Sequence, residues 1–264
     1  WAANTKADIM VVCGVHFMGE TAKILSPKKK VLVPDKNAGC SLADSCPADE
    51  FAKFIQQHPD HIVVSYVNTT AAVKTLTDIV VTSTNARKII DQLPKDAKII
   101  FAPDRNFGNY LNNVTGRNMV LWNGGCHVHE QFSVEKLIEL KRQYPTAKVL
   151  AHPECKNSVL QLADVIGSTQ ALLNYTQQNT ATEFLIATES GILHEMQKHS
   201  PHKRFIPVPP IDSMHDCNEC HYMRLNTLEK LYACLRDETP EITIATDTQK
   251  KAIRPILKML EMSK

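Results

Sequence analysis

Short apolar runs alternate with helix-like stretches along this chain of 264 residues, and that alternation limits it to one fold class. The runs are rich in β-branched residues, and each ends at small, polar or proline residues, as buried strands do. The predicted strands are 9–12, 31–33, 62–67, 79–81, 99–101, 119–121, 149–150, 165–166, 184–186 and 205–208. The predicted helical stretches are 21–25, 70–76, 86–93, 134–144, 160–163, 171–178 and 192–199. Strands that are apolar on both faces and alternate with helices predict an α/β fold, with parallel sheets covered by helices on each side.

The alternation is itself repeated. From residue 62 the order is strand, helix, strand, helix, strand, short connection, strand, and from residue 149 the same order returns. Only two strands precede Cys40, so the first repeat is about half missing. We therefore expect three similar small αβα repeats with parallel sheets around a pseudo-threefold axis, in a chain about 40 residues short of three full repeats. The expected repeats are residues 1–48 with 219–264, residues 49–128, and residues 129–218.

Three of the eight cysteines, Cys40, Cys126 and Cys220, lie in loops that close a predicted repeat. A disulfide framework is typical of much shorter secreted chains. Ligands of open α/β sheets bind beyond the carboxyl ends of the strands, so three repeats around one axis would bring the three thiols to one centre. Zinc is the weaker interpretation, because only Cys217 and Cys220 have C-x-x-C spacing. The same spacing permits a disulfide between Cys217 and Cys220. The plainer alternative is that Cys217 has no functional role. Three thiolates on a 4Fe-4S cluster leave one iron open as a Lewis acid, which predicts dehydration or hydration chemistry at a central iron–sulfur site.

Two pairs of polar side chains follow predicted strands. His152 and Glu154 come directly after strand 149–150, and an imidazole beside a carboxylate can transfer protons. Tyr66 and Asn68 end strand 62–67 on one face, where a phenol and an amide can hydrogen-bond carboxylates or carbonyl oxygens. The plainer alternatives are a solvated His152 and Glu154 and a Tyr66 packed against the next helix.

Hydroxyl side chains stand where strands turn into helices. Ser83, Ser168 and Thr169 occupy such positions, and hydroxyls with backbone amides there suit a phosphate or a carboxylate. N-capping of the helices would also explain them, and both roles are compatible.

Three further polar residues lie close to these motifs. His127 and His129 follow Cys126, and we expect hydrogen bonding around the cluster or packing from them, with no catalytic step. Glu189 is expected to brace its loop or to reach the site.

Ten segments, in order along almost the whole chain, match one known family. They are Cys13-Gly-Val-His-Phe-Met-Gly-Glu-Thr-Ala-Lys, Pro34-Asp35 to Gly39-Cys40, Ser65-Tyr-Val-Asn-Thr, Thr82-Ser-Thr-Asn-Ala, Phe101-Ala-Pro-Asp-Arg-Asn, Trp122-Asn-Gly-Gly-Cys-His-Val-His, Ala151-His-Pro-Glu-Cys, Ile166-Gly-Ser-Thr, Ala187-Thr-Glu-Ser-Gly and Cys217-Asn-Glu-Cys-His-Tyr-Met. In these segments the chain resembles the quinolinate synthases of bacterial NAD biosynthesis. The family's opening His-x-Tyr strand and Gly-Asp-Ser turn do not occur before Cys13.

The resemblance implies a trilobed fold around a 4Fe-4S cluster, with Cys40, Cys126 and Cys220 at the ligand positions. It also implies condensation of iminoaspartate with dihydroxyacetone phosphate to quinolinate, with loss of phosphate and two waters. Catalysis would then involve Glu154, His152 and Tyr66. Substrate contacts would come from these three residues together with Asn68, Ser83, Ser168 and Thr169.

Composition narrows the partners. The net charge of +2, from 30 basic and 28 acidic residues, gives no electrostatic pattern for nucleic acids or membrane surfaces. No apolar run approaches the roughly 20 residues of a membrane span, and no basic leader opens the chain, so we expect a cytoplasmic protein. The resemblance adds an L-aspartate oxidase or dehydrogenase as the source of iminoaspartate. An iron–sulfur redox sensor or a non-catalytic iron–sulfur protein is the alternative, and a nucleotide-binding module ranks lower because no glycine-rich phosphate-binding motif occurs.

Overall fold

The structure is a computed structural model that describes residues 2–212 and 218–264. The chain forms two compact units. Unit 1 comprises Trp1–Pro103, Asn118–Gly124 and His221–Lys264, and unit 2 comprises Asp104–Arg117 and Gly125–Cys220. Each unit contains a four-stranded parallel sheet, and unit 1 has a second, two-stranded one. In the part of the chain that the structure describes, no helix is long and apolar enough to cross a membrane.

The smaller sheet of unit 1 pairs β1 (Ile9–Val11) with β2 (Lys30–Leu32) in parallel, with α1 (His16–Leu25) between them in sequence. Met10, Ala22, Val31, Val33 and Ile242 form its apolar core. Gly19 lets α1 approach this core closely, because a Cβ there would lie 2.9 Å from Val33 Cγ1 and 3.0 Å from Ile242 Cγ1.

The larger sheet of unit 1 has the order β4-β3-β5-β6, with every neighbouring pair parallel. Its strands are β3 (Ile62–Tyr66), β4 (Ile79–Val81), β5 (Ile99–Ala102) and β6 (Val120–Leu121). The helices α3 (Ala48–Gln56) and α4 (Ala71–Lys74) place Phe51 and Val73 on one face, against Val63, Ile100 and Ala102. The long helix α13 (Thr246–Met262) packs along β4 and α4, and α5 (Ala86–Gln92) connects β4 to β5.

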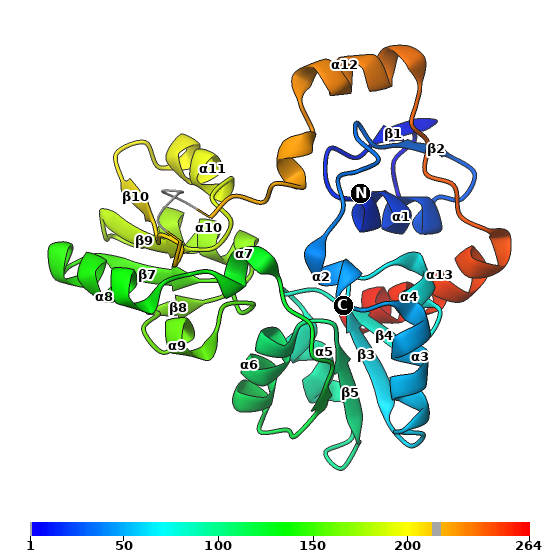
Figure 1. Cartoon of the computed structure of the whole chain (residues 1–264), viewed down its shortest axis with the longest axis horizontal. Coiled ribbons are helices and arrows are strands. Elements are labelled where there is room, and N and C mark those ends of the chain that lie inside the picture. Colours follow the sequence, from blue (N-terminus) through cyan, green and yellow to red (C-terminus); the bar gives the residue numbers. More distant parts are fainter. Residues whose placement is uncertain (1, 213–217) are drawn as a thin grey trace. The chain divides into compact units, whose positions relative to one another are not determined.

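The sheet of unit 2 has the order β10-β9-β7-β8, also parallel throughout (Figure 1). Its strands are β7 (Lys148–Ala151), β8 (Val165–Ile166), β9 (Glu183–Ala187) and β10 (Arg204–Pro207). The helices α8 (Val134–Gln143) and α9 (Asn157–Leu160) bury Leu137 and Val159 against one face. On the other face, α10 (Thr169–Gln178) and α11 (Ile192–His199) bury Leu172 and Met196. Two helical layers with a parallel sheet between them are the predicted α/β architecture.

The two larger sheets are built alike. In each, the first strand in sequence pairs with the second strand on one side and with the third on the other. The third strand then pairs with the fourth, which forms an edge of the sheet. Asp78, just before β4, accepts the Val63 N–H at 2.8 Å and donates its own N–H to the Val63 carbonyl at 2.9 Å. Asp164, just before β8, makes the same pair with Val149, at 2.8 Å in both directions. This repeated pair of hydrogen bonds supports an internal repeat. The pseudo-threefold axis and the division of the chain into three repeats remain predictions.

All ten predicted strands are present, and each end agrees with the prediction or differs by one residue. The expected short connection between β5 and β6 is wrong, because the structure has an 11-residue helix there, α6 (Arg105–Thr115). Asp104 caps the start of α6 by accepting the Phe107 N–H at 2.8 Å, and Gly116 ends it with a left-handed φ of 67°. The helices α2 (Ser41–Asp44), α7 (His127–Glu130), α12 (Leu228–Asp237) and the 3₁₀ turn η1 (Met223–Leu225) complete the described elements.

Candidate active site

The turn after β7 carries His152 and Glu154 at the carboxyl edge of the sheet in unit 2. Ala151, the last residue of β7, pairs with Ile166 of β8 and Ala187 of β9. The ladder continues for one more residue, because the His152 N–H donates to the Ala187 carbonyl at 3.1 Å. The segments that follow β7, β8 and β9 therefore meet at one edge, which is where open α/β sheets bind their ligands.

His152 and Glu154 are both buried, which excludes the alternative of solvated loop residues. The Glu154 N–H donates to His152 Nδ1 at 3.4 Å, so the imidazole proton belongs on Nε2. Burial lowers the pKa of His152 to about 4; the neighbouring His129 adds to this effect and Glu154 opposes it. A neutral His152 with a donor Nε2 beside a carboxylate can donate a hydrogen bond to a substrate oxygen and exchange a proton with it.

Cys126 stands at the N-cap position of α7, and Asp104 holds its backbone. The Cys126 N–H donates to Asp104 Oδ2 at 3.3 Å, while Oδ1 of the same carboxyl caps α6. Asp104 is fully buried, and this burial raises its pKa well above the usual range, with the charge of Glu154 acting in the same direction. Sequence reasoning did not single out Asp104. An aspartate at the start of a helix is nevertheless a recognisable capping signal, and Asp104 precedes α6.

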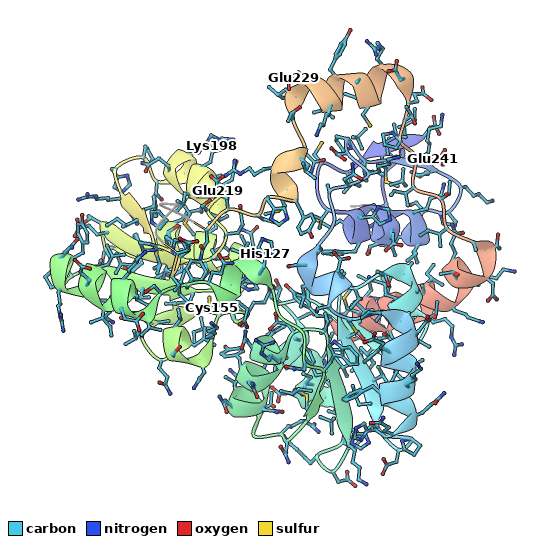
Figure 2. The ribbon with its side chains drawn as sticks, viewed as in Figure 1. His127, Cys155, Lys198, Glu219, Glu229 and Glu241 are labelled. Carbon is cyan, nitrogen blue, oxygen red and sulfur yellow. The ribbon has the colours of Figure 1, made fainter. Side chains whose placement is uncertain are left out.

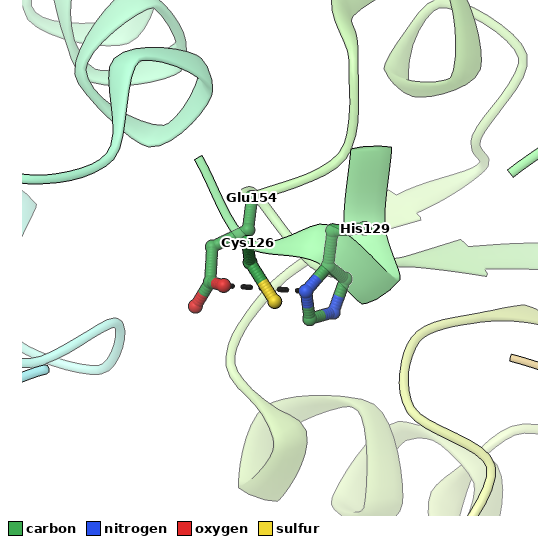
Figure 3. A group of neighbouring side chains, drawn as sticks. All are labelled: Cys126, His129 and Glu154. Carbon is green, nitrogen blue, oxygen red and sulfur yellow. Dashed lines mark ion pairs between the residues drawn. The ribbon is translucent and has the colours of Figure 1, made fainter. Parts of the chain in front are cut away.

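The side chains of His129, Cys126 and Glu154 come together, with the Cys126 sulfur drawn between the His129 ring and the Glu154 carboxylate (Figure 3). Its Nδ1 is 3.2 Å from Glu154 Oε2, its Nε2 is 3.1 Å from Thr188 Oγ1, and its ring centroid is 4.9 Å from that of His152. The hydrogen bonding expected of His129 is present at Thr188, and its close approach to Glu154 is an additional contact that was not expected. Its spacing of three residues from Cys126, one turn of α7, is the signal that could have indicated it.

Cys220 is tied to the loop after β9 by Glu189. Glu189 Oε1 accepts the Cys220 N–H at 3.2 Å, and Oε2 accepts the Gly191 N–H at 2.7 Å, which confirms the bracing role expected of this carboxylate. Asn218 adds a second connection, because its side chain donates to the Val128 carbonyl of α7 at 3.2 Å. Cys217 lies outside the described residues, so the proposed disulfide stays a prediction.

Ser168 and Thr169 begin α10, on the strand end next to His152. Ser168 is buried and caps the helix by accepting the Ala171 N–H at 3.3 Å, whereas Thr169 is exposed. In Figure 2 the labelled Cys155 stands on the turn after β7; it is buried, and its thiol donates to the Ala187 carbonyl at 3.2 Å. The capping role of Ser168 is confirmed, and its contact with an anion stays a prediction.

The remaining predicted site residues belong to unit 1. Tyr66 is the buried last residue of β3, Asn68 follows it half-buried, and Cys40 is half-buried at the N-cap position of α2. Ser83 lies in the turn after β4. N-capping does not explain Ser83, because the N-cap residue of α5 is Asn85, whose side chain accepts the Thr82 N–H at 2.7 Å.

A buried lysine that sequence reasoning missed supports the turn after β3. Lys74 Nζ donates to the Val67 carbonyl at 2.9 Å, and also to the Thr69 carbonyl and hydroxyl. Its burial lowers the pKa of Lys74 to about 7, against the opposing charges of Glu20 and Cys40. Lys74 thereby fixes the segment that carries Tyr66 and Asn68.

Parallel α/β sheets with proton-transfer groups and a cysteine gathered at a carboxyl edge define an α/β enzyme. The sequence model of the family described as "Quinolinate synthetase A protein" matches residues 1–261. The chain is 60% identical to the quinolinate synthases of Microcystis aeruginosa and Synechocystis sp., and 57% identical to that of Chloroherpeton thalassium. These matches cover 99–100% of this chain and 82% of each relative. The chain belongs to the quinolinate synthetase A family and is an enzyme of that type, as its resemblance predicted.

Proposed function

We propose that this chain condenses iminoaspartate with dihydroxyacetone phosphate to quinolinate, losing phosphate and two waters, in the biosynthesis of NAD. The observation that carries the proposal is the buried His152–Glu154 pair beside Cys126, in a chain that matches the family over residues 1–261. The redox-sensor and nucleotide-binding alternatives are not favoured, because the curated relatives are named quinolinate synthases.

We assign a 4Fe-4S cluster to Cys40, Cys126 and Cys220. Among the described cysteines, these three are half-buried and lie on loops or at helix starts, whereas Cys46, Cys155 and Cys234 are buried in the core. Accessible thiols whose backbone is fixed, as Asp104 fixes Cys126 and Glu189 fixes Cys220, fit a thiolate-bound cluster. When bound, such a cluster supplies an open iron that polarises a substrate oxygen or carboxylate.

The chain's own residues supply binding and proton transfer. His152 donates from Nε2 to a substrate oxygen, and Glu154 takes and returns protons as the imine forms and water leaves. Tyr66 and Asn68 bind the substrate, with the Tyr66 phenol as a further donor in catalysis. Ser83, Ser168 and Thr169 bind its phosphate or carboxylate groups. Because His152 and Glu154 are buried, these transfers occur away from bulk water.

The same proposal includes the division of the chain into three repeats, the source of one substrate and the location of the enzyme. The three repeats, residues 1–48 with 219–264, 49–128 and 129–218, would face one axis and bring the three cysteines together. An L-aspartate oxidase or dehydrogenase supplies iminoaspartate, because an imine of this kind is made by oxidation of the amino acid. Nucleic acids are not partners, and the location is cytoplasmic.

The test is anaerobic purification with iron and sulfide analysis, followed by a quinolinate assay with both substrates. We expect Glu154→Gln to lose turnover while it keeps its iron and sulfide, because the variant removes a proton carrier and leaves the three cysteines in place. Glu139→Gln, on the exposed face of α8, is the matched control and should retain turnover. An iron-free wild type, or full turnover in Glu154→Gln, would overturn the proposal.

A further inference from the structure

Three side chains of unit 2 present one sulfur, one nitrogen and one oxygen ligand to a common point. These are Cys126, His129 and Glu154, whose ligand atoms all lie within 4.8 Å of one another. The two buried members are closest, with 3.2 Å between His129 Nδ1 and Glu154 Oε2. Around a tetrahedral Zn²⁺ with bonds of about 2.0–2.3 Å, ligand atoms lie roughly 3.3–3.6 Å apart, so the wider separations, which reach at most 4.8 Å, must close by up to about 1.2 Å to hold one ion.

The orientation of His129 gives a second, independent indication. Its Nε2 is 3.1 Å from Thr188 Oγ1, which fits an Nε2–H that donates to the hydroxyl and leaves a lone pair on Nδ1. Nδ1 is buried and makes no hydrogen bond to any residue in 2–212 or 218–264, although a carboxylate oxygen lies 3.2 Å away. A lone pair and a carboxylate at this distance, out of hydrogen-bond alignment, are arranged as they would be around a cation.

We propose that, when no cluster is bound, Cys126 Sγ, His129 Nδ1 and the Glu154 carboxylate bind a single borderline divalent cation of the Zn²⁺ type. The donor set of thiolate, imidazole and carboxylate is one that Zn²⁺ prefers, and three protein ligands leave its fourth position open. Binding converts the Cys126 thiol to the thiolate and releases one proton. Thr188 is the outer hydrogen-bond partner that fixes the His129 ring, as metal-bound imidazoles require.

This site goes beyond the proposed function, because it belongs to the cluster-free chain. It shares only Cys126 with the three cysteines assigned to the cluster, and it does not involve Cys40 or Cys220. The two occupancies therefore exclude each other at Cys126, and a bound Zn²⁺ should slow the incorporation of iron and sulfide.

Titration of the cluster-free chain of 264 residues with Co²⁺ alone, under anaerobic conditions, tests the proposal. We expect one equivalent to bind with the visible absorption of tetrahedral Co²⁺ and a thiolate-to-cobalt charge-transfer band, and Zn²⁺ to displace it. Thr188→Val, which removes the outer hydrogen-bond partner, should weaken Co²⁺ binding by about 10–100-fold. His129→Ala, which removes a ligand, should weaken it by more than that. Cys126→Ser should remove the charge-transfer band.

Two variants separate this site from the cluster. Cys40→Ser should bind Co²⁺ as the wild type does, and so should Cys155→Ala, which removes a buried neighbouring thiol outside the set. Wild-type affinity in both His129→Ala and Thr188→Val, a charge-transfer band that survives in Cys126→Ser, or loss of binding in Cys40→Ser would each overturn the proposal. Circular dichroism checks that each variant folds, and if His129→Ala does not, Thr188→Val and Cys126→Ser decide. No quinolinate assay enters the test, so it can fail or succeed independently of the proposed function.

Discussion

Replacing Lys74 by methionine should change how the stability of unit 1 depends on pH. Lys74 is completely buried, and its pKa falls from 10.5 to about 7 on folding because burial disfavours the charged amine. Between these two values the unfolded chain binds a proton that the folded chain does not, so this group makes the wild type more stable as pH rises. One pKa unit corresponds to about 1.4 kcal/mol, and integration over pH 7 to 9 gives a gain of about 2 kcal/mol.

Lys74→Met removes this titration and also removes donors from the buried Val67 and Thr69 carbonyls. Each buried acceptor left without a donor costs about 1–3 kcal/mol, a loss that does not depend on pH. We therefore expect the wild type to gain about 2 kcal/mol on the variant between pH 7 and pH 9. The two effects oppose each other at both pH values, and the cost of burying the amine falls to about 2 kcal/mol at pH 9.

The assay is urea unfolding of the cluster-free chain, followed by Trp122 fluorescence in a Trp1→Phe background. Trp122 reports on unit 1 because its ring stands edge-on to Phe51 and Phe54, at centroid distances of 5.6 and 5.3 Å. Lys53→Met, at an exposed position of α3, is the matched control and should run parallel to the wild type. Parallel curves for the wild type and Lys74→Met from pH 7 to 9 would refute the reasoning.

Three further changes test other parts of the structure. His152→Gln should remove an acid-sensitive element: the pKa of His152 falls from 6.5 to about 4 on folding, so the wild type should lose about 2 kcal/mol relative to the variant between pH 7 and 4.5, measured by urea unfolding followed by far-UV circular dichroism, because Trp122 does not report on unit 2. Asp104→Ala should cost about 1–3 kcal/mol in the same assay, through the lost cap of α6 and the freed Cys126 N–H, and Asp104→Asn should recover part of that loss. Gly19→Ala should destabilise by roughly 1–3 kcal/mol, because its Cβ meets Val33 and Ile242, although alanine favours a helix; a higher melting temperature would contradict this.

The strands could be predicted because most are short runs rich in β-branched residues, and the central strands of the two larger sheets are buried on both faces. Val80 of the edge strand β4 and Ile100 of the central strand β5, for example, are fully buried in the larger sheet of unit 1. The missed helices α3, α6 and α13 are amphipathic. α3 buries only Phe51, α6 is rich in asparagine and contains Gly108, and α13 continues through Pro255. Asparagine, Gly108 and Pro255 lower the intrinsic helix propensity of α6 and α13 and mask a helical periodicity that these helices do carry.

In the candidate site, too, only the contacts between residues close in sequence could be predicted. His152 and Glu154 are two residues apart, so their meeting needs only a turn after β7, and the sequence predicts it. The approach of His129 to Glu154, and of Asp104 to Cys126, joins segments far apart in sequence. These contacts depend on which loops the sheet edge brings together, which sequence spacing alone does not specify.

The equivalent hydrogen-bond pairs made by Asp78 and Asp164 align the two larger sheets residue by residue. This alignment shows which polar residues occupy the same place at the two strand ends. Asp78 with Val63 and Asp164 with Val149 fix equivalent positions on β3 and β7. Counting forward from each valine by the same number of residues aligns Tyr66 with His152, and Asn68 with Glu154. Each sheet thus presents two polar side chains at the same place, one ring and one amide or carboxylate. Burial then separates their roles, because Glu154 is buried beside His152, whereas Asn68 is half-buried and uncharged. We therefore expect the pair in unit 2 to transfer protons and the pair in unit 1 to hydrogen-bond the substrate.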